Sequence, residues 1–143
     1  MTRAEEPSQS TQPPPLADLL AMIPYAVMLG MELVSASADE VVGRLAWRAE
    51  LCTTGGALHG GALMSLADNL GGLCAYLNLP AGAGTATISS STNFMRGVRD
   101  GHVTGTARPL RVGRSVIVIQ TDLRDDAGRL VVQTTQAQAV IGS

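Results

Sequence analysis

The chain has 143 residues, of which 45% are apolar and 15% charged, a balance that fits one domain with a buried core. Its formal net charge of −2 argues against a nucleic-acid-binding surface. Arginine supplies all ten basic residues, and the absence of lysine excludes a P-loop lysine and Schiff-base chemistry.

The N-terminal part divides into a tail and the start of a domain. Residues 1–15 are polar and rich in proline, so we expect a disordered tail there and a single domain over residues 16–143. Residues 16–34 are apolar, but two acidic residues, a proline and a glycine interrupt them, which disfavours a membrane helix. We expect a short helix over about 16–22 and then a turn into the first strand.

The cysteines and histidines show no zinc-site spacing. Cys52 and Cys74 stand apart from each other and from His59 and His102, so we expect no metal. No signal peptide is recognisable, and we therefore expect a cytoplasmic protein with reduced cysteines.

Two extended segments precede the central part of the chain. Residues 30–37 and 40–48 predict a hairpin with Ala38 and Asp39 in its turn, and residues 53–56 form a loop. Four residues of the second strand share the face that we expect to point to the core: Val41, Gly43, Leu45 and Trp47.

A long amphipathic helix is predicted from about residue 59 to 78. Its leucines, at positions 63, 66, 70, 73 and 77, are spaced by three and four residues and mark a buried stripe. Asp68 lies on another face, among small neighbours that include Gly71 and Gly72. A glycine inside a helix costs about 1 kcal/mol relative to alanine, so this pair indicates close approach of another backbone or of a ligand. The alternative is that Asp68 is an ordinary exposed residue.

The segment His59-Gly60-Gly61 stands where this helix begins. Amide N–H groups in a first turn have no intrahelical acceptors and lie at the positive end of the helix dipole, a suitable place for a developing negative charge. The two glycines leave room for a substrate carbonyl. The alternative is a glycine turn with His59 as a structural cap.

Four further strands follow, over residues 85–95, 101–110, 114–124 and 129–141. Residues 81–84 form a flexible connection, and residues 111–114 and 125–128 are hairpin turns. One helix against about six strands is an α+β architecture.

His59-Gly60-Gly61, with Asp68 nine residues after the histidine in Leu66-Ala67-Asp68, resembles the hotdog-fold acyl-CoA thioesterases of the PaaI and 4-hydroxybenzoyl-CoA thioesterase type. The resemblance runs from about residue 25 to the end of the chain. It implies an antiparallel sheet wrapped around the central helix, in a homodimer formed by edge-to-edge sheet extension or in a homotetramer of two such dimers.

The resemblance also implies catalytic roles. The Gly60 amide would hold the thioester carbonyl oxygen, and Asp68 would act as general base on water or attack directly. His59 and Gly60 would come from one subunit and Asp68 from its partner, with His59 as an orienting residue. Thr87 stands where related enzymes carry a Ser or Thr that orients the water.

The substrate implied is an acyl-CoA, and coenzyme A is part of it, so no separate cofactor is expected, nor a nucleic-acid or membrane partner. Thr53 replaces the Asn or Gln that such enzymes often carry six residues before the histidine. Gly61 and Ser65 are further expected substrate contacts, and Arg111 and Arg114 are expected to meet the CoA phosphates.

Two other functions stay open. A hotdog hydratase or dehydratase would need a catalytic histidine paired with a carboxylate on the substrate face, and the sequence does not show that motif. A non-catalytic acyl-CoA binding or regulatory protein would not need Asp68.

Overall fold

The structure, a computed structural model, describes residues 14–142, so the tail expected over residues 1–15 lies almost wholly outside the described part. The helices are α1 (Leu16–Ala21), α2 (Pro24–Leu29) and α3 (Gly60–Tyr76), and a short 3-10 helix spans Ala49–Leu51. The strands are β1 (Glu32–Ala36), β2 (Val41–Ala46), β3 (Gly84–Phe94), β4 (His102–Val112), β5 (Val116–Asp125) and β6 (Leu130–Ile141). Within residues 14–142, no helix is both long and apolar enough to cross a bilayer.

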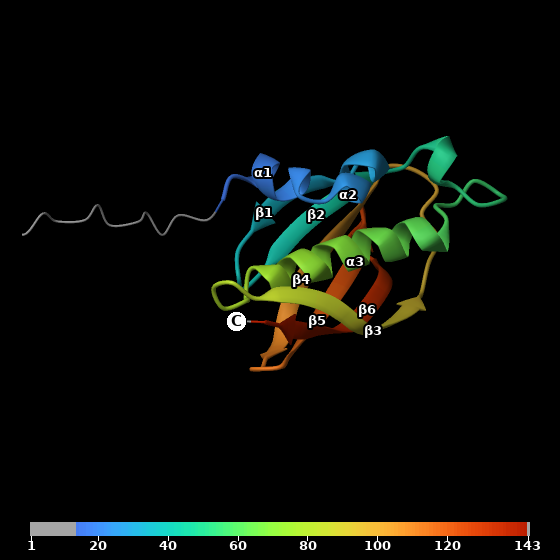
Figure 1. The fold of residues 1–143 in the computed structure, drawn as a ribbon. Helices are drawn as coiled ribbons and strands as arrows, with labels where there is room; N and C mark the ends of the chain where they lie inside the picture. The colour runs from blue at the N-terminus through green and yellow to red at the C-terminus, as the bar shows by residue number, and fades with distance from the viewer. Residues whose placement is uncertain (1–13, 143) are drawn as a thin grey trace, which may run out of the picture.

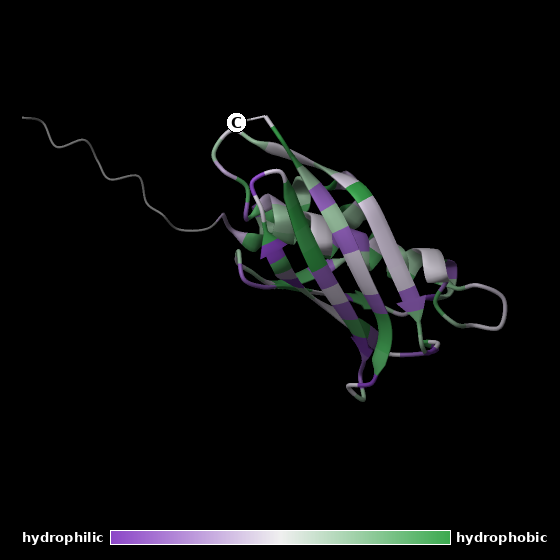
Figure 2. Ribbon diagram, turned by 90° about the horizontal axis from the view of Figure 1, so that it is seen from below, coloured by the Kyte–Doolittle hydropathy of each residue, from purple (hydrophilic) through white to green (hydrophobic). Residues whose placement is uncertain are grey.

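The six strands form one antiparallel sheet in the order β1-β2-β4-β5-β6-β3, and α3 lies across one face of it (Figure 1). The expected α+β architecture of about six strands and one long central helix is therefore confirmed. β1 and β3 are the edge strands. Figure 2 shows the sheet from the side away from α3, where hydrophilic and hydrophobic segments alternate along the strands.

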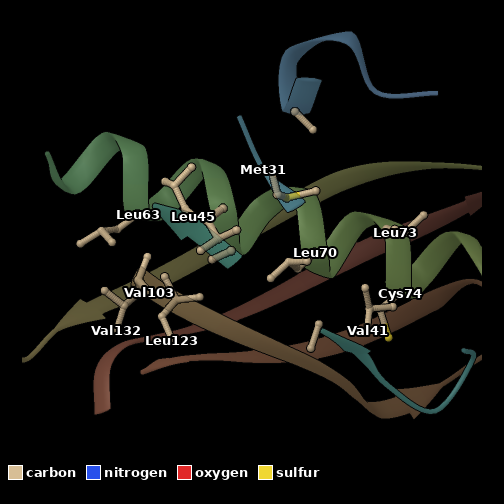
Figure 3. Packing of buried hydrophobic residues seen from close by; sticks show 14 of the residues in the cluster. Met31, Val41, Leu45, Leu63, Leu70, Leu73, Cys74, Val103, Leu123 and Val132 are labelled. Atoms are coloured by element: carbon tan, nitrogen blue, oxygen red, sulfur yellow. The ribbon is translucent and has the colours of Figure 1, made fainter. Parts of the chain in front are cut away.

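Leu70, in the buried stripe of α3, packs against two glycines of the sheet. Gly43 of β2 and Gly105 of β4 are direct cross-strand partners, and a Cβ on either would lie 2.6 or 2.5 Å from the Leu70 side chain. The two missing side chains thus make room for Leu70, which is fully buried, and let the helix approach the sheet. In Figure 3, Leu70 lies among core side chains that include Leu45 and Val103.

The structure has a second helix, α2, where we expected a turn into the first strand. It begins with Pro24 and ends at Gly30, whose φ of 82° is left-handed, and this pairing of an early proline with a terminal glycine is a helix signal. The guanidinium of Arg48, two residues beyond the end of β2, donates to the Leu29 carbonyl at 3.0 Å and so caps the helix.

Candidate active site

α3 begins with His59 as its N-cap. The Nδ1 atom of His59 accepts a hydrogen bond from the Gly61 N–H at 2.8 Å, so the proton of the neutral imidazole lies on Nε2. No acceptor for the Gly60 N–H is found among residues 14–142. As the cap of the helix, His59 thus binds the Gly61 N–H, whereas the Gly60 N–H stays available to a ligand.

A hydrogen-bonded chain ties this helix start to α2. The Ser65 hydroxyl donates to the Gly61 carbonyl at 2.8 Å, and its oxygen lies 2.8 Å from the Tyr25 hydroxyl. Since Ser65 has one proton to donate, Tyr25 is the donor of the second bond. Sequence reasoning missed Tyr25, because α2 itself was not predicted, and the helix signal of Pro24 and Gly30 would have found it.

A cavity of about 300 Å³ opens beside the second half of α3, and both Asp68 and Thr87 line it. Asp68 is exposed in the single chain, as the alternative interpretation required, but its surroundings are the wall of this cavity. The remaining lining residues are Met22, Ile23, Asn69, Gly72, Leu73, Tyr76, Thr85, Ala86 and Gln138. The structure thus brings together two of the residues expected to be catalytic.

Two buried glutamines of β6 connect Thr87 with Asp68. The Thr87 hydroxyl donates to Gln138 Oε1 at 2.6 Å. Gln136 Nε2 donates to the same Gln138 oxygen at 3.1 Å and to Asp68 Oδ1 at 3.4 Å. Sequence reasoning missed both glutamines, although polar residues on the helix-facing side of a strand are a recognisable signal.

The glycine pair of α3 has two separate explanations. A Cβ at Gly71 would lie 2.0 Å from Gln136 Oε1, so Gly71 makes room for a side chain of β6 rather than for another backbone. A Cβ at Gly72 would meet nothing within 4 Å, because this residue lines the cavity. Only Gly72 is placed for the approach of a ligand.

The other expected site residues lie elsewhere in the single chain. Thr53 is exposed in its loop, where its N–H donates to the Ala57 carbonyl at 2.9 Å. Arg111 and Arg114 line a second hollow of about 300 Å³, which shares no residue with the cavity at Asp68. No group of three or more His, Cys, Asp or Glu that could hold a metal ion is found in the described part of the chain.

The helix start and Asp68 are also apart within one chain. Gly60 precedes Asp68 by eight residues of α3, which corresponds to roughly 12 Å along the helix axis. Within one protomer, the two groups are therefore separated by more than two turns of α3.

Comparison with known proteins agrees with this architecture. Residues 55–132 match the model of the thioesterase superfamily. A candidate esterase of Vibrio cholerae is 42% identical over 76 residues, 53% of this chain and 51% of that protein. The chain thus spans about half the length of the first curated relatives that it matches. The 1,4-dihydroxy-2-naphthoyl-CoA hydrolase of Escherichia coli is 31% identical over 86 residues, 60% of this chain and 63% of that protein.

Solved structures extend the similarity over nearly all of the chain. A thioesterase from Haemophilus influenzae superposes with a TM-score of 0.86 and 27% identity, covering 92% of this chain and 93% of that one. A mutant thioesterase from Pseudomonas aeruginosa gives a TM-score of 0.85 and 27% identity, covering 92% and 96%. Because the family model matches more than half of the residues of this chain, the chain belongs to the thioesterase superfamily, and it has the hotdog fold.

Proposed function

We propose that this protein hydrolyses acyl-CoA thioesters to the free acid and coenzyme A. The observation that carries the proposal is that Asp68 and Thr87 line one cavity in a member of the thioesterase superfamily. The cavity has apolar walls, among them Ile23 and Leu73, that suit an acyl group. An Escherichia coli relative is named as a hydrolase of an aromatic acyl-CoA, which supports the choice of a CoA thioester.

In the reaction, Asp68 removes a proton from water, and the water oxygen attacks the thioester carbonyl carbon. The carbonyl oxygen becomes negative and is stabilised by the Gly60 N–H at the positive end of α3. The carbon–sulfur bond then breaks, and coenzyme A leaves as a thiolate that takes a proton from solvent, while Asp68 returns its proton to solvent. If Asp68 attacks directly, the intermediate is an anhydride that water hydrolyses to the same products.

Thr87 is suited to hold the attacking water. Its hydroxyl proton is donated to Gln138 Oε1, so the oxygen of Thr87 is left to accept a hydrogen bond from the water. Asp68 accepts the second proton of that water. Two acceptors on one cavity wall thus fix the direction in which the water lone pair points.

We place each complete site between two copies of the chain, with His59 and Gly60 from one and Asp68 from the other. The eight residues that separate Gly60 from Asp68 in one protomer, roughly 12 Å along the helix axis, support this arrangement. The edge strand β3 and the neighbouring face of α3 also expose apolar side chains, which a second copy would cover: Met64, Tyr76, Ile88 and Phe94. Two such dimers would form the tetramer.

We assign the second hollow to the coenzyme A phosphates. Arg111 and Arg114 both line it, and guanidinium groups bind phosphate through paired hydrogen bonds. Thr53, Gly61 and Ser65 remain proposed contacts of the substrate near the helix start.

The test is release of free thiol from a panel of aliphatic and aromatic acyl-CoA thioesters. We expect turnover by the wild type, and we expect Asp68→Asn to lower kcat by about 10²–10⁴ with little change in substrate binding. Circular dichroism of Asp68→Asn serves as the control for folding. Normal turnover by this variant would remove Asp68 from the mechanism, and binding without turnover by the wild type would favour the non-catalytic function.

A further inference from the structure

Gln136 stands out because it is a polar side chain in the apolar layer between α3 and the sheet. It is 1% exposed, and it lies on the helix-facing side of β6. Its Nε2 group donates to Asp68 Oδ1 and to Gln138 Oε1, while its Oε1 has no hydrogen-bond partner among residues 14–142.

The orientation of this amide follows from its neighbours. Asp68 Oδ1 and Gln138 Oε1 are both acceptors, so a reversed amide would set the Gln136 carbonyl against two other oxygens. The Asp68 carboxylate only accepts, so it sets the Gln136 amide, and Gln136 in turn sets Gln138, whose Oε1 also accepts from Thr87 at 2.6 Å and whose Nε2 donates to Thr85 Oγ1 at 3.2 Å. The donor side of Gln136 therefore faces Asp68.

Two features that accompany Gln136 lower the stability of the folded state. Burying an amide whose carbonyl is unpaired costs about 1–3 kcal/mol relative to an apolar side chain. A glycine inside a helix costs about 1 kcal/mol relative to alanine, and a Cβ at Gly71 would lie 2.0 Å from Gln136 Oε1, so an alanine there would displace the Gln136 amide. A leucine at 136 would avoid the first cost, so stability alone does not account for a glutamine there.

The contact with Asp68 offers a functional reason for a glutamine at position 136. Asp68 makes no ion pair within residues 14–142, and no Arg, Lys or His lines its cavity. A neutral amide can hold one carboxylate oxygen by a hydrogen bond. An arginine in the same place would stabilise the negative charge of Asp68 more strongly and so make it a weaker base. The other oxygen, Oδ2, accepts no hydrogen bond within the described residues.

We propose that Gln136 is a positioning residue for the reaction: its buried amide fixes the Asp68 carboxylate through Oδ1, leaves Oδ2 for the attacking water, and joins Asp68 to Thr87 through Gln138. This inference rests on the proposed function. The distance of 3.4 Å is long for a hydrogen bond, and catalytic hydrogen bonds commonly shorten when substrate binds.

The first experiment compares Gln136→Met with Gln133→Met. Methionine keeps the length of the side chain and removes the donor. Gln133 also donates from Nε2 to an aspartate, Asp122 Oδ1 at 3.0 Å, but lies away from Asp68 on the same strand, so it is a matched control. We expect Gln136→Met to lower kcat by about tenfold or more with KM little changed, and Gln133→Met to keep wild-type kcat.

A merely structural effect is separated by a double variant. If Gln136 acts through Asp68, adding Gln136→Met to Asp68→Asn causes no further loss of the residual kcat, whereas a structural defect lowers kcat in both backgrounds. If the methionine variant does not fold, Gln136→Leu is the second variant, since leucine also removes the donor. Wild-type kcat in a folded Gln136→Met or Gln136→Leu would overturn the inference while leaving the proposed function intact.

A second readout does not depend on turnover. The carboxyl carbon of Asp68 is identified by NMR as the resonance that Asp68→Asn removes. We expect its chemical shift to differ between the wild type and Gln136→Met and to be the same in Gln133→Met, because only the first variant removes a donor from this carboxylate. An unchanged shift in Gln136→Met overturns the inference, whereas absent thiol release by the wild type counts against the proposed function.

Discussion

Gly71 of α3 lies against the side-chain carbonyl of Gln136 on β6, so closely that a Cβ at position 71 would be 2.0 Å from that oxygen. The contact joins residues 65 positions apart in the chain. Packing within the protomer therefore explains the glycine at position 71, whereas its neighbour Gly72 lines the cavity.

This difference predicts opposite effects for two adjacent substitutions. We expect Gly71→Ala to lower the free energy of unfolding by about 1–3 kcal/mol, because the new methyl group overpacks a buried site. We expect Gly72→Ala to raise it by about 0.5–1 kcal/mol, because alanine is the better helix former and the Cβ meets nothing within 4 Å. Urea unfolding of the two variants measures both changes, and equal stabilisation would show that Gln136 moves aside at little cost.

The proposed role of the Gly60 amide predicts a sharp difference between Gly60→Pro and Gly60→Ala. Proline has no N–H yet is well tolerated at the first position of a helix, which Gly60 occupies. His59, with φ −60° and ψ 137°, already has the extended conformation that precedes proline. We expect the proline variant to lose about 10²–10³ in kcat and the alanine variant far less. Thiol-release kinetics measure this, and equal kcat values would exclude the Gly60 N–H as the donor to the oxyanion.

A site shared between subunits predicts recovery of activity in mixed dimers. Chains carrying Gly60→Pro are co-expressed with differently tagged chains carrying Asp68→Asn, and the mixed species is purified through both tags. One of its two sites then combines both defects and the other has neither, so we expect about half the wild-type activity per dimer. If both groups act within one chain, every site carries one defect and the mixed dimer is as inactive as its parents.

The Cys74 thiol predicts a stability difference at alkaline pH. Burial, with a smaller effect of the Asp39 charge, raises its pKa from 9.0 to about 11. The folded state keeps this proton where the unfolded state loses it, so the stabilisation is complete below pH 9 and is lost as pH rises toward 11. We expect the free energy of unfolding of the wild type to fall more steeply over that range than that of Cys74→Ala. Parallel curves would contradict the raised pKa.

The same burial predicts slow alkylation of Cys74 in the native protein. Only the thiolate reacts, and the Cys74 side chain is fully buried. We expect iodoacetamide at pH 8 to modify Cys74 only at the rate of unfolding, and mass spectrometry of peptides from protein labelled with and without urea measures it. Rapid native labelling would show that the helix opens locally at this residue.

Part of the fold could be predicted from local patterns. The leucine spacing located α3 within two residues at each end. All four leucines inside the helix are buried, and the fifth of the pattern, Leu77, is partly buried just beyond its end. The strand segments after α3 also agree with β3 to β6, except that Arg111 and Val112, which we expected in a hairpin turn, are the last residues of β4. α2 was missed because the glycine at its end, Gly30, was assigned to the first extended segment and Arg48, which caps it, to the second.

For the candidate site, the sequence by itself determined the helix, its glycine-rich start and the carboxylate two turns later, because periodicity and helix-end chemistry are local properties. Only the tertiary structure decided that Thr87 shares a cavity with Asp68 and that Gln136 and Gln138 lie between them. The physical reason is the strand order. β3, the first strand after α3, pairs with β6, the last strand, so residues about fifty or more positions apart become hydrogen-bond partners. A single sequence carries no local signal for such a pairing.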